Sequence, residues 1–143
     1  MTDQAQASYD VEKFRDLIKD IPFAMFTTVT AHGGLRSRPM VATVDAFDGR
    51  LWFFTRTGSA VAQEISGNYQ INVTYVSAPE DRFISVSGRA LVSRDIERAG
   101  QLWSPSYNQW FAGGASDAEL SMIAIDVARV EYWDRKAGRM QLL

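Results

Sequence analysis

Cationic and hydroxyl side chains gather in one segment of the chain, residues 35–65. The hydroxyls precede a short predicted helix at 60–65 and belong to Thr55, Thr57 and Ser59; the arginines are Arg36, Arg38 and Arg56. A helix start leaves backbone N–H groups unpaired, and guanidinium forks match phosphate oxygens, so this segment could hold a phosphate-bearing ligand. The same residue types also form ordinary helix caps and solvent-exposed strand faces, and spacing alone leaves both interpretations open.

A second group of residues could bind a flat ligand. Aromatic residues make up 12% of the chain, and several of them lie between Trp103 and Phe111, beside Pro105 and the Gly113–Gly114 pair. Aromatic faces pack against each other, against a partner chain or against a ring-shaped ligand. Packing is the commoner use, and both uses are compatible if a ligand lies at an interface.

Composition excludes several classes of chemistry. The 143 residues contain no cysteine and one histidine, which rules out disulfides, thiolate catalysis and a multi-histidine metal site within one chain. The net charge is −2, with 12 arginines and 3 lysines among the 15 basic residues, so a nucleic-acid partner is not expected. No apolar run approaches the roughly 20 residues of a membrane span, and the polar first residues are unlike a secretory signal. We therefore expect a cytoplasmic protein with no membrane partner.

The order of periodic segments predicts one mainly β domain over residues 1–143. Helices are expected at 9–20, 60–65 and 94–103, and strands at 23–31, 35–47, 51–55, 69–76, 83–92, 120–127 and 129–134. Turns are expected at His32–Gly34 and at Asp48–Gly49, disorder at 1–8, and a peripheral tail at 136–143. Strands joined by short turns favour an antiparallel barrel of six or seven strands with two or three peripheral helices.

Two residues mark special positions in the predicted sheet. Pro39 has no N–H to donate, which indicates an edge strand or a bulge. Gly88 interrupts an otherwise regular strand and indicates a bulge. No glycine-rich dinucleotide fingerprint or P-loop is present, so neither kind of nucleotide fold is expected.

Several of these segments resemble one protein family. Arg38-Pro39-Met40 after a glycine turn, the LWFFT strand, Ser59 and Glu64-Ile65 look like the flavin-binding half of the split-barrel family related to pyridoxamine 5'-phosphate oxidase. Later segments resemble its general stress protein 26 branch: FISVSGRALV at 83–92, Leu102-Trp103, WFAGG at 110–114 and Glu131-Tyr132-Trp133. The resemblance covers roughly residues 10–134 and depends on the order and spacing of these segments together.

The resemblance implies a split β-barrel, a homodimer, and FMN at the dimer interface, with FAD and the deazaflavin F420 as alternatives. It places the isoalloxazine ring along Arg38, Pro39, Met40 and Val41. It places the ribityl chain along Phe53, Phe54 and Thr55, and the phosphate at Ser59 and the position of Val61. A partner chain would supply aromatic side chains, for which the candidates are Tyr107, Trp110 and Trp133.

The chain departs from the family in two places. The family usually has a lysine two residues after the loop serine, where this chain has Val61. Arg36, Arg38 or Arg56 could balance the phosphate charge in its place, and if none of them reaches the phosphate, flavin affinity is expected to fall. True pyridoxamine 5'-phosphate oxidases use an Arg-x-His element, which this chain lacks because its one histidine lies in the turn at His32. Oxidation of pyridoxamine phosphate is therefore not expected, and His32 gives poor support for an axial haem ligand.

The resulting hypothesis is a flavin-binding protein that acts as a flavin-dependent oxidoreductase. The flavin would supply the redox chemistry, so no catalytic side chain is assigned and no metal is required. Arg38 beside the ring would stabilise negative charge on reduced flavin. The alternatives are a non-catalytic flavin-binding stress or carrier module, and an F420-dependent reductase.

Overall fold

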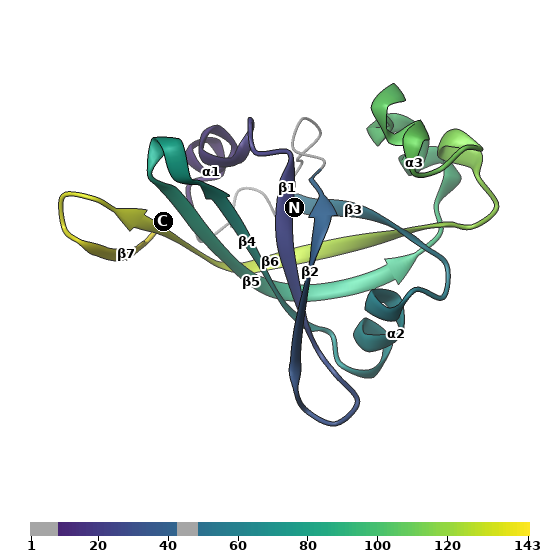
Figure 1. The fold of residues 1–143 in the computed structure, drawn as a ribbon, viewed down its shortest axis with the longest axis horizontal. Helices are drawn as coiled ribbons and strands as arrows, with labels where there is room; N and C mark the ends of the chain where they lie inside the picture. Colours follow the sequence, from purple (N-terminus) through teal and green to yellow (C-terminus); the bar gives the residue numbers. More distant parts are fainter. Residues whose placement is uncertain (1–8, 43–48) are drawn as a thin grey trace, which may run out of the picture.

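The computed structural model describes residues 9–42 and 49–143, and within them the fold is a curled antiparallel sheet with peripheral helices (Figure 1). The seven strands of this part of the chain are β1 (Phe23–Val29), β2 (Leu35–Val41), β3 (Arg50–Arg56), β4 (Gln70–Ser77), β5 (Arg82–Ser93), β6 (Leu120–Asp134) and β7 (Arg139–Leu142). The helices are α1 (Val11–Ile18), α2 (Ala60–Gly67) and α3 (Ile96–Leu102), with short 3-10 turns η3 (Ala78–Glu80), η4 (Pro105–Gln109) and η5 (Gly114–Ser116). The predicted fold class is confirmed.

The strands follow the order β2-β1-β4-β5-β6-β3, and β7 pairs with β6. All pairings are antiparallel. The sheet curls so far that the two ends of this order, β2 and β3, both contribute side chains to one pocket. In Figure 1, α2 lies at the lower right of the view, and α3 lies at the upper right together with the neighbouring turns.

The main core fills the concave side of the sheet. Phe26, Val73 and Val86 from adjacent strands are fully buried there, as is Phe14 of α1, and Ile65 of α2 belongs to the same core. Burial of such side chains is the main favourable term in folding, at about 25 cal/mol per Å² of apolar surface. A second buried cluster lies where α3 covers the outer side of β3 and β6: Trp52, Ala99, Leu102, Phe111, Leu120, Met122 and Ala124.

Both special positions predicted in the sheet are confirmed. Pro39 lies on β2, which is the edge strand of the pairing order, so its missing N–H breaks no ladder. The register of β5 against β6 shifts between Ser87 and Gly88, where the bulge is predicted, and the extra residue, Ala128, lies opposite on β6. A Cβ on Gly88 would collide with the main-chain carbonyl of Asp126, so the bulge requires glycine.

Several boundaries differ from the sequence prediction. The two strands expected at 120–127 and 129–134 are one continuous strand, β6. The pairing with β5 passes over Ala128, so the interruption expected there is a bulge within β6 and not a break between two strands. The tail expected to be merely peripheral contains β7, which pairs with residues 131–134 of β6. The expected disorder at 1–8 and the second half of the strand expected at 35–47 lie wholly or largely outside the described residues.

The helix caps follow the expected chemistry. The Asp10 carboxylate accepts a hydrogen bond from the Lys13 backbone N–H at the start of α1. The Ser59 hydroxyl accepts one from the Ala62 N–H at the start of α2. In the described part of the chain, no helix has the length and apolar character needed to cross a bilayer.

Candidate functional site

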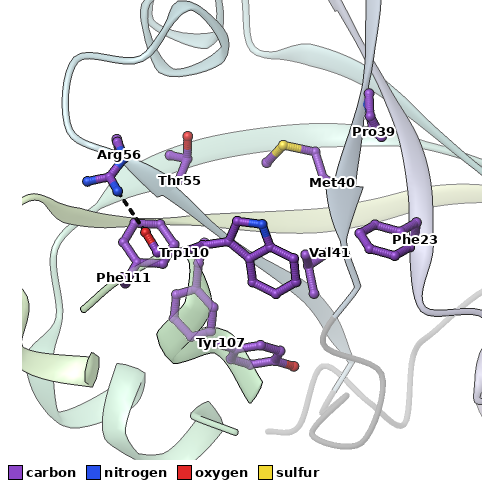
Figure 2. A pocket seen from close by; sticks show the side chains of 10 residues that line it. Phe23, Pro39, Met40, Val41, Thr55, Arg56, Tyr107, Trp110 and Phe111 are labelled. Carbon is purple, nitrogen blue, oxygen red and sulfur yellow. Dashed lines mark hydrogen bonds between the residues drawn. The ribbon is translucent and has the colours of Figure 1, made fainter. Parts of the chain in front are cut away.

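A pocket of about 390 Å³ opens between the C-terminal half of β2, the end of β3 and the segment that follows α3 (Figure 2). Its walls are formed by Phe23, Pro39, Met40, Val41, Phe54, Thr55, Arg56, Tyr107, Trp110 and Phe111. Seven of these ten residues belong to the set that the resemblance assigned to a flavin: Pro39, Met40, Val41, Phe54, Thr55, Tyr107 and Trp110. The pocket lies within the range of roughly 300–1,000 Å³ that small-molecule sites occupy.

One wall comes from β2 and its neighbour β1. Val41 pairs with Phe23 and Pro39 pairs with Met25 in the β1–β2 ladder, so the Phe23 side chain lies beside the β2 residues. Phe23 is 51% exposed, which is high for an aromatic residue that is not at a chain end. This wall is therefore apolar and accessible, and it follows an edge strand whose outer side is unpaired in the described structure.

The opposite wall comes from the end of β3, where Phe54, Thr55 and Arg56 line the pocket. Phe53 points into the main core, where its ring meets Phe26 edge-to-face at 5.2 Å between centroids. Phe54 points to the other side, where it packs against the second buried cluster and lines the pocket. Arg56 also faces the pocket (Figure 2). The prediction grouped Phe53 with Phe54 and Thr55. The structure places Phe53 in the core, on the face of β3 opposite to Phe54, because successive side chains of a strand alternate in direction. Thr55 does line the pocket, next to Arg56 at the end of the strand.

Trp110 lies across the pocket and connects its two walls. Its ring meets Phe23 edge-to-face at 6.4 Å between centroids, and its main-chain carbonyl accepts a hydrogen bond of 2.7 Å from Nη2 of Arg56. Figure 2 shows the indole between Val41 and Phe111, with the Arg56 hydrogen bond as a dashed line. Trp110 is 39% exposed, so its ring remains accessible to a ligand.

A cluster of aromatic rings supports the segment that carries Trp110. The Trp103 ring lies 5.0 Å from Phe54 and 5.5 Å from Tyr107, and Tyr107 lies 5.6 Å from Phe54. The Trp103 indole N–H donates to the side-chain oxygen of Asn108 at 2.8 Å. These contacts fix η4 against β3, and the aromatic patch thus serves both packing and pocket lining.

Arg38 is directed away from the pocket, toward α2. Its Nη2 donates to Glu64 at 2.6 Å and its Nη1 donates to the hydroxyl of buried Thr28 at 2.8 Å. Arg36 donates to the other Glu64 oxygen at 2.9 Å. The Thr28 hydroxyl and the Arg38 guanidinium, together with the charge of Arg36, lower the pKa of Glu64 below its usual value. The alternate arginines of β2 therefore form an ion-pair network with α2 and are not merely a solvated strand face.

The remaining predicted residues lie outside the pocket. Ser59 caps α2, and its hydroxyl is 2.7 Å from that of Thr55, which does line the pocket. Val61 is 5% exposed and belongs to the main core. Trp133 lies on β6, where it pairs with Met140 of β7.

Three lining residues were absent from the predicted set: Phe23, Arg56 and Phe111. Arg56 was considered only as a candidate partner for a phosphate. The predicted hairpin around His32 could have indicated Phe23, since it brings the start of β1 beside the end of β2. Phe111 follows Trp110 directly, but nothing local shows that both reach one pocket, because Phe111 belongs also to the second buried cluster.

The fold and the match to a family model together define the class of protein. The chain belongs to the pyridoxamine 5'-phosphate oxidase-like family, whose model matches residues 9–143. This agrees with the resemblance drawn from the residues, and with a curled antiparallel sheet whose two ends meet at an apolar pocket.

Individual relatives agree with this assignment. A general stress FMN/FAD binding protein from Xanthomonas citri is 26% identical, with a TM-score of 0.74 over 92% of this chain and 91% of that one. A protein from Clostridium acetobutylicum related to general stress protein 26 has a TM-score of 0.79 at 15% identity, over 93% and 92% of the chains, and shows similarity of fold. Protein bli-3 of Neurospora crassa is 26% identical over 89% of this chain and 69% of its own.

Proposed function

We propose that this chain is an FMN-binding flavoprotein. The observation that carries the proposal is the pocket itself, which brings the Pro39–Val41 strand opposite Phe54 and Thr55 and beneath the accessible ring of Trp110. The family membership and the FMN/FAD-binding relative from Xanthomonas citri support it.

The residues present fit the parts of FMN. The isoalloxazine ring is flat and largely apolar, and the pocket offers two strand segments with Phe23, Tyr107 and Trp110. The phosphate is an anion, and Arg56 is a cation among the lining residues. The donors and the apolar surface of this pocket therefore match both ends of the cofactor.

Different residues of the pocket would contact different parts of the cofactor. Pro39, Met40 and Val41 would contact the ring, and Phe54 and Thr55 would contact the chain that links the ring to the phosphate. Trp110 would cover the ring and exclude water. The flavin supplies hydride or electron transfer when bound, and the protein orients it.

A homodimer with the flavin at its interface is part of the proposal. Phe23 and Met25 on one face of β1 are 51% and 42% exposed, and Phe23 lines the pocket. Apolar side chains beside an open site are typical of a surface that a second copy covers. Trp133 does not line the pocket of its own chain, so a role at the flavin requires a second copy. Sedimentation should show a dimer, and Met25→Glu should shift it toward a monomer; a monomeric wild type would contradict this part.

Oxidoreductase activity is the second part of the proposal, and membership of the pyridoxamine 5'-phosphate oxidase-like family supports it. NADH or NADPH should reduce the bound flavin under anaerobic conditions, which bleaches its visible absorption. A bound flavin that neither dinucleotide reduces would instead favour the non-catalytic stress or carrier module.

The identity of the cofactor can be tested directly. Protein purified from cells should be denatured, and the released small molecule should be identified by mass and absorption. Release of FMN is the expected result, while FAD or F420 would replace FMN in the same site. A released compound of another class would contradict the proposal.

A further inference from the structure

Arg56 is held at the edge of the pocket by an aromatic face. Its guanidinium carbon lies 5.1 Å from the centroid of the Phe111 ring, and both residues line the pocket (Figure 2). A guanidinium over an aromatic face is attracted by the ring electrons while its N–H groups stay at the edge, free to face other acceptors. Phe111 is itself buried, so the platform under Arg56 is rigid.

The present partners of Arg56 are easily exchanged. Within residues 9–42 and 49–143 its side chain makes one hydrogen bond, to the Trp110 carbonyl. Its ion pair with Glu119 spans 3.8 Å, and the Glu119 side chain is 71% exposed. Exposed pairs of this kind contribute little, because water and salt screen them. Most of the five N–H donors of Arg56 can therefore turn to an incoming anion.

The other two arginines considered for the phosphate, Arg36 and Arg38, are already paired with Glu64. Arg36 and Arg38 bind opposite oxygens of Glu64, and Arg38 also donates to the Thr28 hydroxyl. The side chains of Arg38 and Glu64 are only 19% and 12% exposed. Moving either partner would leave a largely buried charge unpaired, which is costly. An anion in the pocket therefore cannot recruit Arg38 without disrupting the attachment of α2.

We propose that Arg56 holds the phosphate of the cofactor, in place of the lysine that the family pattern has where this chain has Val61. The proposal rests on the proposed FMN function. In it, a phosphate oxygen replaces the Trp110 carbonyl as acceptor for Nη2 of Arg56, while the contact with Phe111 is kept. Val61 takes no part, because it is buried in the main core and bears no charge.

The proposal predicts that the phosphate contributes to binding through one identifiable side chain. Riboflavin is FMN without its phosphate, so the ratio of the two dissociation constants isolates the phosphate contacts. A hydrogen bond to a charged group corresponds to about 10- to 150-fold in affinity. Wild-type protein should therefore prefer FMN over riboflavin by about that factor.

The experiment titrates FMN and riboflavin separately into apo wild type, Arg56→Gln, Arg56→Lys and two controls. Arg50→Gln is the matched control, because Arg50 lies on the same strand, is 53% exposed beside 55% for Arg56, and pairs with Asp126. Arg36→Gln is the second control, because Arg36 is the more exposed partner of Glu64. Flavin fluorescence gives each dissociation constant, and circular dichroism checks that each variant is folded.

Arg56→Gln should lose most of the preference for FMN while its riboflavin affinity stays within about twofold of wild type. Arg56→Lys should keep part of the preference because it retains the charge. Both controls should bind like wild type. An unchanged FMN preference in Arg56→Gln overturns the assignment of Arg56, and loss of the preference in Arg36→Gln transfers the role to the Glu64 network. Absence of binding of both flavins to wild type overturns the FMN function itself, and this proposal with it.

Discussion

The carboxylate of Glu64 is bound by two arginines of one strand, with Nη2 of Arg38 at 2.6 Å from one oxygen and Nη1 of Arg36 at 2.9 Å from the other. These ion pairs attach α2 to the edge strand β2, and β2 forms one wall of the pocket. The hydroxyl of Thr28, which is fully buried, donates to the first oxygen at 2.6 Å. The network therefore fixes the strand that the cofactor would lie along, without contacting the cofactor itself.

Replacing Glu64 by Gln should destabilise the protein at neutral pH. Arg38 would keep a largely buried charge with a weakened partner, and the melting temperature should fall. Glu119→Gln is the control, because its carboxylate is exposed and 3.8 Å from Arg56, and its effect on melting should be small. Equal effects of the two substitutions in thermal denaturation would show that the Glu64 network does not stabilise the fold.

The contribution of Glu64 should depend on pH in a definite direction. Its pKa in the folded state is lowered by the Thr28 hydroxyl and by Arg38, so folding favours the ionised form. This stability is fully present above the ordinary glutamate pKa of about 4.3 and is lost as pH falls through the lower folded value. The difference in melting temperature between wild type and Glu64→Gln should therefore be constant from pH 7 to about 5 and shrink below about 4. A difference that grows on acidification would contradict this assignment.

Substituting Gly88 by Ala should be costly although the change is small. The added Cβ would meet the Asp126 carbonyl and the Ile125 side chain, so the two strands must shift at the bulge between β5 and β6. We expect a loss of about 1–3 kcal/mol in the free energy of unfolding, as for overpacked sites. Gly100→Ala is a suitable control, because its Cβ would meet nothing within 4 Å and alanine favours a helix. Urea unfolding measures both, and equal stability of the two variants would contradict the account of the bulge.

Removing the indole of Trp110 should weaken flavin binding and leave the fold intact. Trp110 is 39% exposed and belongs to neither buried cluster, so truncation leaves little cavity in the core. Loss of stacking on a ring-shaped ligand is worth about 1–3 kcal/mol, which predicts roughly 5- to 150-fold weaker FMN binding by Trp110→Ala. Trp110→Phe should restore part of it. Wild-type affinity in Trp110→Ala would show that this ring does not cover the cofactor.

Local sequence patterns predicted most of the fold. Pro39 indicated an edge strand and Gly88 a bulge, because each breaks a rule of regular sheets at its own position. The order of hairpins gave the antiparallel barrel, and Ser59 gave the helix cap. The split of β6 into two strands was wrong because Ala128, which the pairing with β5 passes over, is an extra residue within one strand and does not end it.

The site was less predictable because it depends on contacts between distant segments. Nothing near Arg38 shows that Glu64 will take its guanidinium, and a two-residue period does not tell which face of β3 carries Phe53 into the core. The pocket combines residues from β1, β2, β3 and the segment at 107–111, which only the curl of the sheet brings together. Arg56 is held at the pocket by the Phe111 ring and by the Trp110 carbonyl, and both contacts follow from the curl of the sheet.

The most direct test of the central claim is an equilibrium titration of FMN into the apo protein, followed by flavin fluorescence. Trp110 lines the pocket, so the flavin emission should be quenched on binding and should saturate at one FMN per chain. Saturable quenching at micromolar FMN or below, which corresponds to at least about 8 kcal/mol, is the result predicted here. Unchanged emission up to about millimolar FMN would contradict it, since such weak binding is incompatible with a cofactor site.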